Sequence, residues 1–145
     1  MNLDNKSSLH STKSHPEHKT ASPAAAKYDL EERRLQFASA VIDVSEKLPD
    51  RKAPKYIGGQ FLRADTSPHG NHGEAQSAES RDDFIPKMKV CLKELREADR
   101  WARLIERKRW SADARLAFVP QEAQELIRIF KASLQTTEKN RAAKP

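Results

Sequence analysis

The stretch from Phe84 to Arg109, FIPKMKVCLKELREADRWARLIERKR, predicts one long helix with two different faces. Its apolar residues recur in steps of four and three, so on a helix they form a single stripe. They are Phe84, Met88, Cys91, Leu95, Ala98, Ala102 and Ile105. A stripe of this length needs cover from the rest of the chain. We therefore expect the fold to be built around this helix.

The same stretch carries a stripe of basic residues with the same alternation of steps. At about 100° per residue these residues lie largely opposite the apolar stripe. They are Lys89, Lys93, Arg96, Arg100, Arg103 and Arg107. Asp99 is spaced to pair with Arg103, and Glu97 with Arg100. Two interpretations remain open: a solvated face neutralised by such pairs, or a surface that contacts phosphates.

A first helix is predicted from near Asp29, where Asp29 and Glu32 form a capping box, to a stop before Pro49. Its apolar residues are Leu30, Phe37, Val41, Val44 and Leu48, with Ala38 and Ile42 beside them. The polar link 50–53 is short, so the next helix is expected to run antiparallel to the first.

The second helix is predicted to open at Pro54, because a proline suits a first helical position. Its stripe changes from apolar to small and polar halfway along, where Pro68, Gly70 and Gly73 each disfavour a helix interior. We expect a kink near Pro68 or a broken helix. The small residues also predict a close helix crossing.

The central helix is expected to start within a second capping box, Ser80 to Asp83, and Pro86 fits best if Asp83 is the cap. Trp110 and Ser111 end this helix and cap the last one. The last helix has a possible break before Pro120 and should fray from Thr136. Its apolar residues are Leu116, Val119, Ala123, Leu126, Ile127, Phe130 and Leu134.

Four helical segments with short links, and no stretch of period two, predict an all-α, up-and-down four-helix bundle over residues 28–138. Residues 1–27 hold only Leu3 and Leu9 as large apolar side chains, which predicts a disordered basic tail. Residues 139–145 are expected to be a frayed C-terminus. Trp101 and Leu104 lie off the central stripe, so apolar surface is left for contact with another copy.

The net charge of the chain is +6, and residues 1–27 supply +2 of it through four lysines against Asp4 and Glu17. Such a surplus permits binding to nucleic acid, depending on how it is clustered. Cys91 is the only cysteine, and its place in the apolar stripe predicts a core residue rather than a nucleophile. We find no apolar run of membrane-spanning length and no signal peptide, and we expect a cytoplasmic protein.

Several short motifs resemble a small bacterial family of four-helix-bundle proteins encoded in intervening sequences of large-subunit ribosomal RNA genes. The residues that carry the resemblance are Phe61–Ser67, Asn71, Glu74–Gln76, Ala78–Ser80, Asp83–Phe84, Lys93–Glu97, Trp101, Leu104, Glu122–Leu126 and Ala132–Leu134. The resemblance covers roughly residues 28 to 138. It implies an all-helical bundle that assembles as a ring of five and has no established enzymatic activity. Relatives that accompany reverse transcriptases in diversity-generating retroelements resemble basic nucleic-acid-binding accessories.

The motif residues Arg63, Ser67, Asn71 and Glu74 lie near one face of the second helix. A structural seam explains them more simply than an acid–base site, because no histidine base is paired with a nucleophile. The spacing of His69 and His72, and the tail histidines His10, His15 and His18, do not match a metal site. We expect no cofactor.

The sequence supports two functional hypotheses. The first is a non-catalytic, homo-oligomeric bundle, a pentamer by resemblance, that binds RNA, DNA or an RNA–protein complex through the basic helix and tail. The alternative is a structural or protein-interaction module with an unknown protein partner and no nucleic-acid binding. An enzyme is a distant third.

Overall fold

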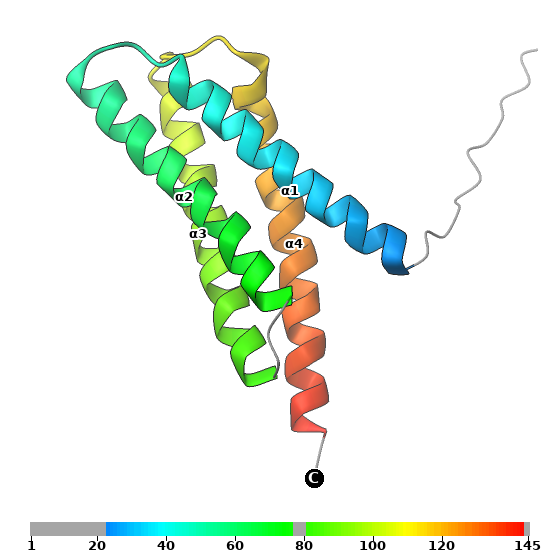
Figure 1. Cartoon of the computed structure of the whole chain (residues 1–145). Helices are drawn as coiled ribbons and strands as arrows, with labels where there is room; N and C mark the ends of the chain where they lie inside the picture. The colour runs from blue at the N-terminus through cyan, green and yellow to red at the C-terminus, as the bar shows by residue number, and fades with distance from the viewer. Residues whose placement is uncertain (1–22, 77–80, 144–145) are drawn as a thin grey trace, which may run out of the picture.

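The computed structural model describes residues 23–76 and 81–143, with side chains described from residue 29 except for 65–82. It contains four helices: α1 (Pro23–Glu46), α2 (Lys52–Gln76), α3 (Arg81–Arg107) and α4 (Ala114–Ala142). Each helix runs antiparallel to the next, and α1 also packs against α4, so the helices form a closed four-membered bundle (Figure 1). The predicted all-α four-helix bundle is confirmed. In the described part of the chain, no helix has the apolar length that a bilayer crossing needs.

The central helix α3 packs along both α2 and α4, and its predicted apolar stripe is the core of the bundle (Figure 1). Every member of that stripe is buried except Phe84, which is half-buried. Ile85 and Leu92 are also buried, because a helix with two neighbours buries more than one narrow stripe. Trp101 packs against this core, whereas Leu104 remains partly exposed.

The ends of α3 differ from the prediction. The helix starts at Arg81, so Pro86 is its sixth residue and cannot bond the carbonyl of Asp82 four residues before it. It ends at Arg107 rather than Arg109. Arg109 has φ 56° and donates to the Glu106 carbonyl, and the Trp110 N–H bonds the Ile105 carbonyl. These bonds form a Schellman motif with a left-handed residue that is usually glycine.

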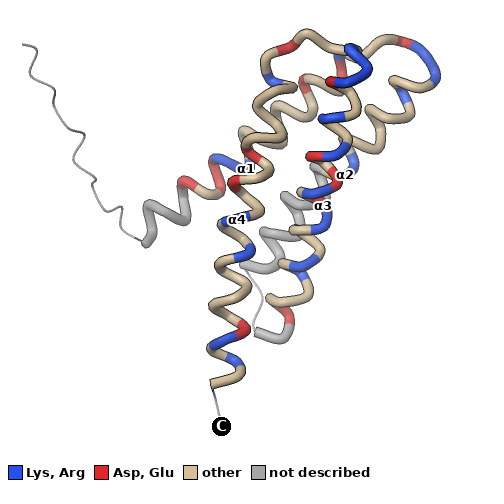
Figure 2. Tube along the Cα trace, turned by 180° about the vertical axis from the view of Figure 1, so that it is seen from behind, with Lys and Arg blue, Asp and Glu red and all other residues tan. Residues whose placement is uncertain are grey.

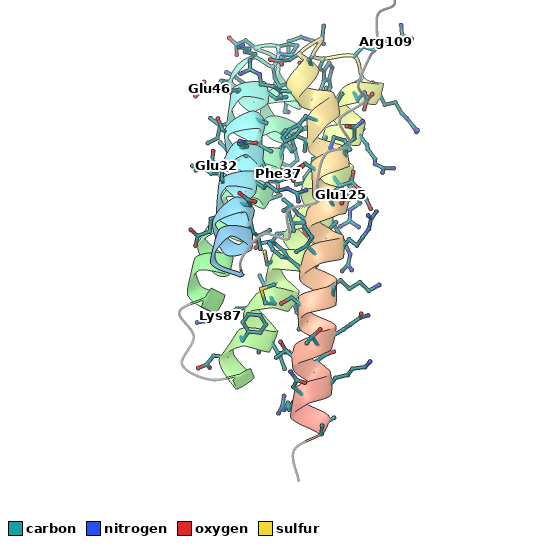
Figure 3. All side chains as sticks on the ribbon, turned by 90° about the vertical axis from the view of Figure 1, so that its right-hand side faces the viewer. Glu32, Phe37, Glu46, Lys87, Arg109 and Glu125 are labelled. Carbon is teal, nitrogen blue, oxygen red and sulfur yellow. The ribbon has the colours of Figure 1, made fainter. Side chains whose placement is uncertain are left out.

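The first helix begins at Pro23 rather than near Asp29, because a run of alanines follows the proline and alanine is the strongest helix former. Asp29 therefore lies within the helix, and Glu32 accepts from Gln36 one turn onward instead of capping. Phe37 lies on the inner side of α1, whereas Glu32 and Glu46 lie on its outer side (Figure 3). In Figure 1 the N-terminal end of α1 leans away from the other helices.

The second helix is continuous from Lys52 to Gln76, so of the two alternatives expected near Pro68, a kink or a break, the break does not occur. The helix opens two residues before Pro54, which is fully buried in its first turn. A close approach occurs at Gly58, against the side chain of Leu48 in the link between α1 and α2. A Cβ atom built there would lie 2.9 Å from Leu48 Cδ1, whereas one at Gly59 would meet nothing within 4 Å. The side chains near Gly70 and Gly73 lie outside the described residues.

The last helix starts after Asp113, which replaces Ser111 as the expected cap because its Oδ1 accepts from the Arg115 N–H at 2.9 Å. The Ser111 hydroxyl instead accepts from the Asp113 N–H at 3.1 Å. The helix is continuous through Pro120 and ends at Ala142, beyond the expected fraying at Thr136. All predicted core residues of α4 are buried except Ile127, which packs against the core from a half-buried position.

Ion pairs fasten α1 to α4 at two levels. Arg33 Nε lies 2.7 Å from Glu122 Oε1, and Arg115 Nη1 lies 2.6 Å from Asp43 Oδ2. The Arg115 guanidinium also donates to both carboxylate oxygens of Asp113, from Nε to Oδ1 and from Nη2 to Oδ2. This side-chain bond, assisted by the backbone N–H of Arg115, holds the pKa of Asp113 well below its usual range. The ionised form of Asp113 is therefore the form that the fold favours.

The two adjacent glycines of α2 provide a matched test of the close approach. Gly59→Ala should raise the free energy of unfolding by about 0.5–1 kcal/mol, because alanine is the better helix former and the site is open. Gly58→Ala should gain less or lose stability, because Leu48 must move to admit the methyl group. Urea denaturation measures both values. Equal or greater stabilisation by Gly58→Ala would contradict the close packing.

Replacing Asp113 by Asn keeps the helix-capping oxygen but removes the charge. Because the folded-state pKa is lowered, the carboxylate stabilises the fold above its unfolded pKa of about 4 and loses this effect as the pH falls further. Asp113→Asn should therefore lower the urea midpoint at pH 7, and the difference from wild type should narrow below about pH 4. Asp50→Asn is the control, because its exposed pair with Lys55 contributes little. A difference that is independent of pH would exclude this linkage.

Candidate nucleic-acid interface

The predicted basic stripe forms one exposed face of α3. Lys and Arg positions recur along the length of α3 in Figure 2. The six exposed residues are Lys89, Lys93, Arg96, Arg100, Arg103 and Arg107. The structure therefore places all six together, and we call this surface the α3 basic face.

Two members of the α3 basic face make ion pairs. Lys89 Nζ lies 3.5 Å from Glu138 Oε1 of α4, and Arg103 Nε lies 2.9 Å from Asp99 Oδ1, as the sequence spacing predicted. The expected pair between Glu97 and Arg100 is absent, both residues being within the described part. Among the described residues, four members of the face make no ion pair; they are Lys93, Arg96, Arg100 and Arg107. Neutralisation by the carboxylates of the described residues is therefore incomplete.

Asp99 connects the α3 basic face to α4. Its residue is only 8% exposed, and its two carboxylate oxygens accept from Arg103 Nε and from Gln124 Nε2, the latter at 2.8 Å. The carboxylate holds one edge of the Arg103 guanidinium at the boundary between α3 and α4. Sequence spacing indicated the pair with Arg103. It gave no sign of Gln124, which lies 25 residues away in the chain.

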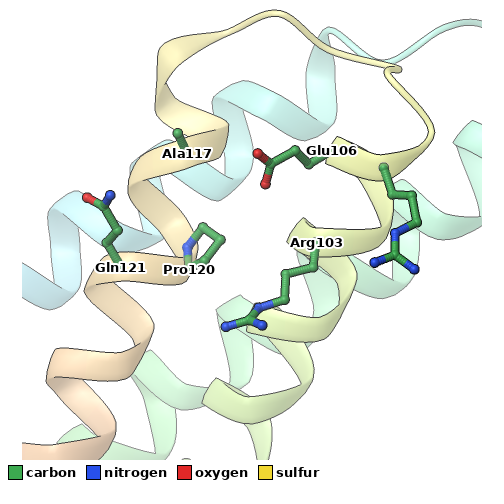
Figure 4. A pocket seen from close by; sticks show the side chains of 6 residues that line it. Arg103, Glu106, Ala117, Pro120 and Gln121 are labelled. Carbon is green, nitrogen blue, oxygen red and sulfur yellow. The ribbon is translucent and has the colours of Figure 1, made fainter.

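A groove lies next to the C-terminal end of the α3 basic face. It has a volume of about 500 Å³ and lies between α3 and α4. Its lining residues are Arg103, Glu106, Arg107, Ala117, Pro120 and Gln121. Arg103 and Glu106 extend from α3 toward α4 on either side of Pro120 (Figure 4). The sequence predicted the two arginines as part of a face, but not the groove.

The family motif on α2 is described only in part. Arg63 is exposed, whereas the side chains of Ser67, Asn71 and Glu74 lie outside the described residues. The structural-seam and acid–base interpretations of this motif therefore both stay predictions. All five histidines also lie outside the described side chains, and within the described residues no three metal-ligating side chains gather.

Cys91 lies in the core rather than at a reactive surface. Burial raises the pKa of its thiol to about 11, although the nearby Arg34 guanidinium acts in the opposite direction. The thiol is therefore protonated at neutral pH, as expected for a core residue. Arg34 is itself only 5% exposed and lies 5.6 Å from the centre of the Phe130 ring. The sequence gave no sign of this buried arginine, which α1 contributes to the core beside α4.

Comparisons with known proteins support the fold. No protein-family model and no curated protein matches the chain. Among solved structures, the chain is similar to a crystal structure of a protein of unknown function from the S23 ribosomal protein family of Bacteroides thetaiotaomicron VPI-5482. The two share 25% sequence identity with a TM-score of 0.64, over 72% of this chain and 97% of that chain. The bundle is therefore similar in fold to a member of the S23 ribosomal protein family.

Proposed function

We propose that this protein is a non-catalytic, homo-oligomeric helical bundle that binds nucleic acid, RNA in particular, through the α3 basic face. The observation that carries the proposal is the row of exposed cations in which four of six lack an ion pair among the described residues. From Lys89 to Arg107 the row is about 27 Å long at 1.5 Å per residue. A nucleic-acid backbone presents several phosphates over such a length.

The similarity of this chain to known proteins supports RNA as the ligand. A solved protein with the same fold belongs to a family named for a ribosomal protein, and short motifs of this chain resemble proteins encoded within ribosomal RNA genes. We therefore propose that the chain is a relative of that intervening-sequence family and acts in the cytoplasm. The basic tail, residues 1–22 of which lie outside the described part, is proposed to add to the binding.

Self-association would strengthen a surface of this kind, because the bundle carries a modest charge surplus. An apolar row on α1 supports association: Leu35 is 52% exposed and Ile42 is 37% exposed, seven residues apart on one side of the helix. The row leads to a groove of about 370 Å³ between α1 and α2 that includes Gly58 and Leu62. We propose that another copy covers this surface, as a ring of five by resemblance.

The alternative function is a structural or protein-interaction module without nucleic-acid binding. The observation that favours this alternative is the hydroxyl of Ser45 in the α1–α2 groove. Ser45 Oγ is buried there and, within the described residues, has no hydrogen-bond partner. A partner that entered the groove could supply that bond. On this alternative the α3 basic face is an ordinary solvated surface, and an unknown protein occupies the α1–α2 groove.

Salt dependence distinguishes the two functions. Each phosphate that the protein neutralises releases counterions, so the logarithm of affinity should fall linearly with the logarithm of salt concentration. Changing Arg96, Arg100 and Arg103 to Gln should reduce the slope by up to about one unit for each lost phosphate contact. Filter binding of RNA at several salt concentrations measures the slope, and analytical ultracentrifugation checks that assembly is unchanged.

The control removes the same charge elsewhere. Lys52, Lys131 and Lys139 are exposed on α2 and α4, and their triple change to Gln should leave most of the slope intact. Equal effects of the two triple variants would show that net charge, rather than the α3 basic face, determines binding. A folded wild type that binds neither RNA nor DNA at low salt would reject nucleic-acid binding and favour the interaction module.

A further inference from the structure

The groove between α3 and α4 is formed by matching faces of two antiparallel helices. Arg103, Glu106 and Arg107 have i, i+3, i+4 spacing on α3, and Ala117, Pro120 and Gln121 have the same spacing on α4. Each set therefore lies on one side of its helix, and the two sides line the same groove, which has a volume of about 500 Å³ (Figure 4). The groove adjoins the α3 basic face because Arg103 and Arg107 belong to both.

The groove contains a carboxylate that a simple phosphate site would not favour. Glu106 is exposed and, in the described part of the chain, makes no ion pair. Close to a phosphate this charge would be repulsive. It is suited instead to accept hydrogen bonds from neutral N–H groups, such as those of nucleobases.

The donor in the groove is held in position. Arg103 uses Nε to bond Asp99, and Asp99 is fixed in turn by Gln124. The bond through Nε directs the guanidinium along the wall of the groove, where Figure 4 shows it reaching toward α4. The terminal nitrogens of Arg103 are hydrogen-bond donors, and Glu106, three residues later on the same helix, provides the acceptor.

The α4 side of the groove is partly apolar. The ring of Pro120 and the methyl group of Ala117 line it, and Pro120 is half-buried. A proline within a helix also has no N–H for the carbonyl four residues earlier, which here belongs to Leu116. The groove thus combines a small apolar surface with both donors and acceptors, which is the chemistry that surrounds an unstacked base.

We infer that this groove binds one unpaired guanine of a single-stranded nucleic acid whose phosphates lie along the α3 basic face. Guanine offers O6 and N7 as acceptors for Arg103, and its N1–H and N2–H₂ groups as donors for Glu106. Uracil has no amino group to offer Glu106. In a duplex the same guanine edge is paired, so the site selects unpaired guanine. The inference rests on the proposed nucleic-acid binding and adds base selectivity to it.

The test compares short single-stranded oligouridines with and without one central guanosine, at one salt concentration. Wild type should bind the guanosine-containing strand about tenfold more tightly, the selectivity of one good bidentate contact. Glu106→Gln should remove most of this preference, because the amide places a donor opposite guanine donors. The same variant should bind plain oligouridine more tightly, because it removes a negative charge beside the phosphates.

Glu97→Gln is the matched control. Glu97 lies on the same helix about two and a half turns earlier and does not line the groove. This variant removes the same charge, so it should tighten binding to both strands and keep the guanosine preference. Annealing each strand to its complement, oligoadenosine with or without one central cytidine, should abolish the preference in wild type.

The outcomes separate the inference from the proposed function. If wild type binds both strands equally, or if Glu106→Gln and Glu97→Gln keep the same preference, the base site is wrong while binding through the α3 basic face stands. If wild type binds neither strand at low salt, the proposed nucleic-acid binding itself fails. Circular dichroism checks that the variants fold. Glu106 lies in the last turn of α3, where a negative charge is unfavourable for the helix dipole, so Glu106→Gln should not destabilise the helix.

Discussion

The burial of the α3 apolar stripe is the constraint on which the rest of the structure depends. Leu95, Ala98, Ala102 and Ile105 are almost wholly buried against both neighbouring helices. Because the helix has a fixed period, burying that stripe also fixes which side chains face the solvent. The α3 basic face is thus exposed by the same packing that stabilises the bundle. A rotation of α3 that exposed its cations less would also take the core out of register.

The fold could be predicted from periodicity, whereas details that depend on tertiary contacts could not. The predicted apolar stripes of α3 and α4 follow from apolar spacing alone, and so does the all-α class. Burial of Arg34 depends on α4 lying beside α1, and the close approach at Gly58 depends on how the link that carries Leu48 folds onto α2. The residue pattern of a single helix specifies neither. Helix ends were also misplaced: Asp113 displaced Ser111 as cap because its carboxylate is oriented by Arg115 from the following turn.

The candidate site shows the same division. The six cations of the α3 basic face were predictable because they share one helix and one period. The side of α3 that faces α4 was not predictable in this way. Ile85, Leu92, Asp99 and Glu106 recur every seven residues, but they mix apolar and acidic side chains and so give no amphipathic signal. The position of α4 explains why Asp99 meets Gln124 and why Glu106 lines a groove, and the packing of α3 between two helices explains why Ile85 and Leu92 are buried.

Charge alone would make the α3 basic face a weak and unselective surface. Phosphate contacts supply affinity but carry no sequence information, and exposed cations are screened within about 10 Å at moderate salt. Two structural features act on different parts of this problem. On the proposed function, association through the exposed Leu35 and Ile42 would bring several basic faces into one assembly and so multiply phosphate contacts. The α3–α4 groove places Arg103, held by Asp99, near the exposed Glu106, and we infer that this pair distinguishes bases rather than phosphates. On the proposed function, assembly would depend on the surface of α1 and α2. Phosphate contacts and base selectivity would both depend on α3, with α4 completing the groove, so Arg103 and Arg107 would serve both.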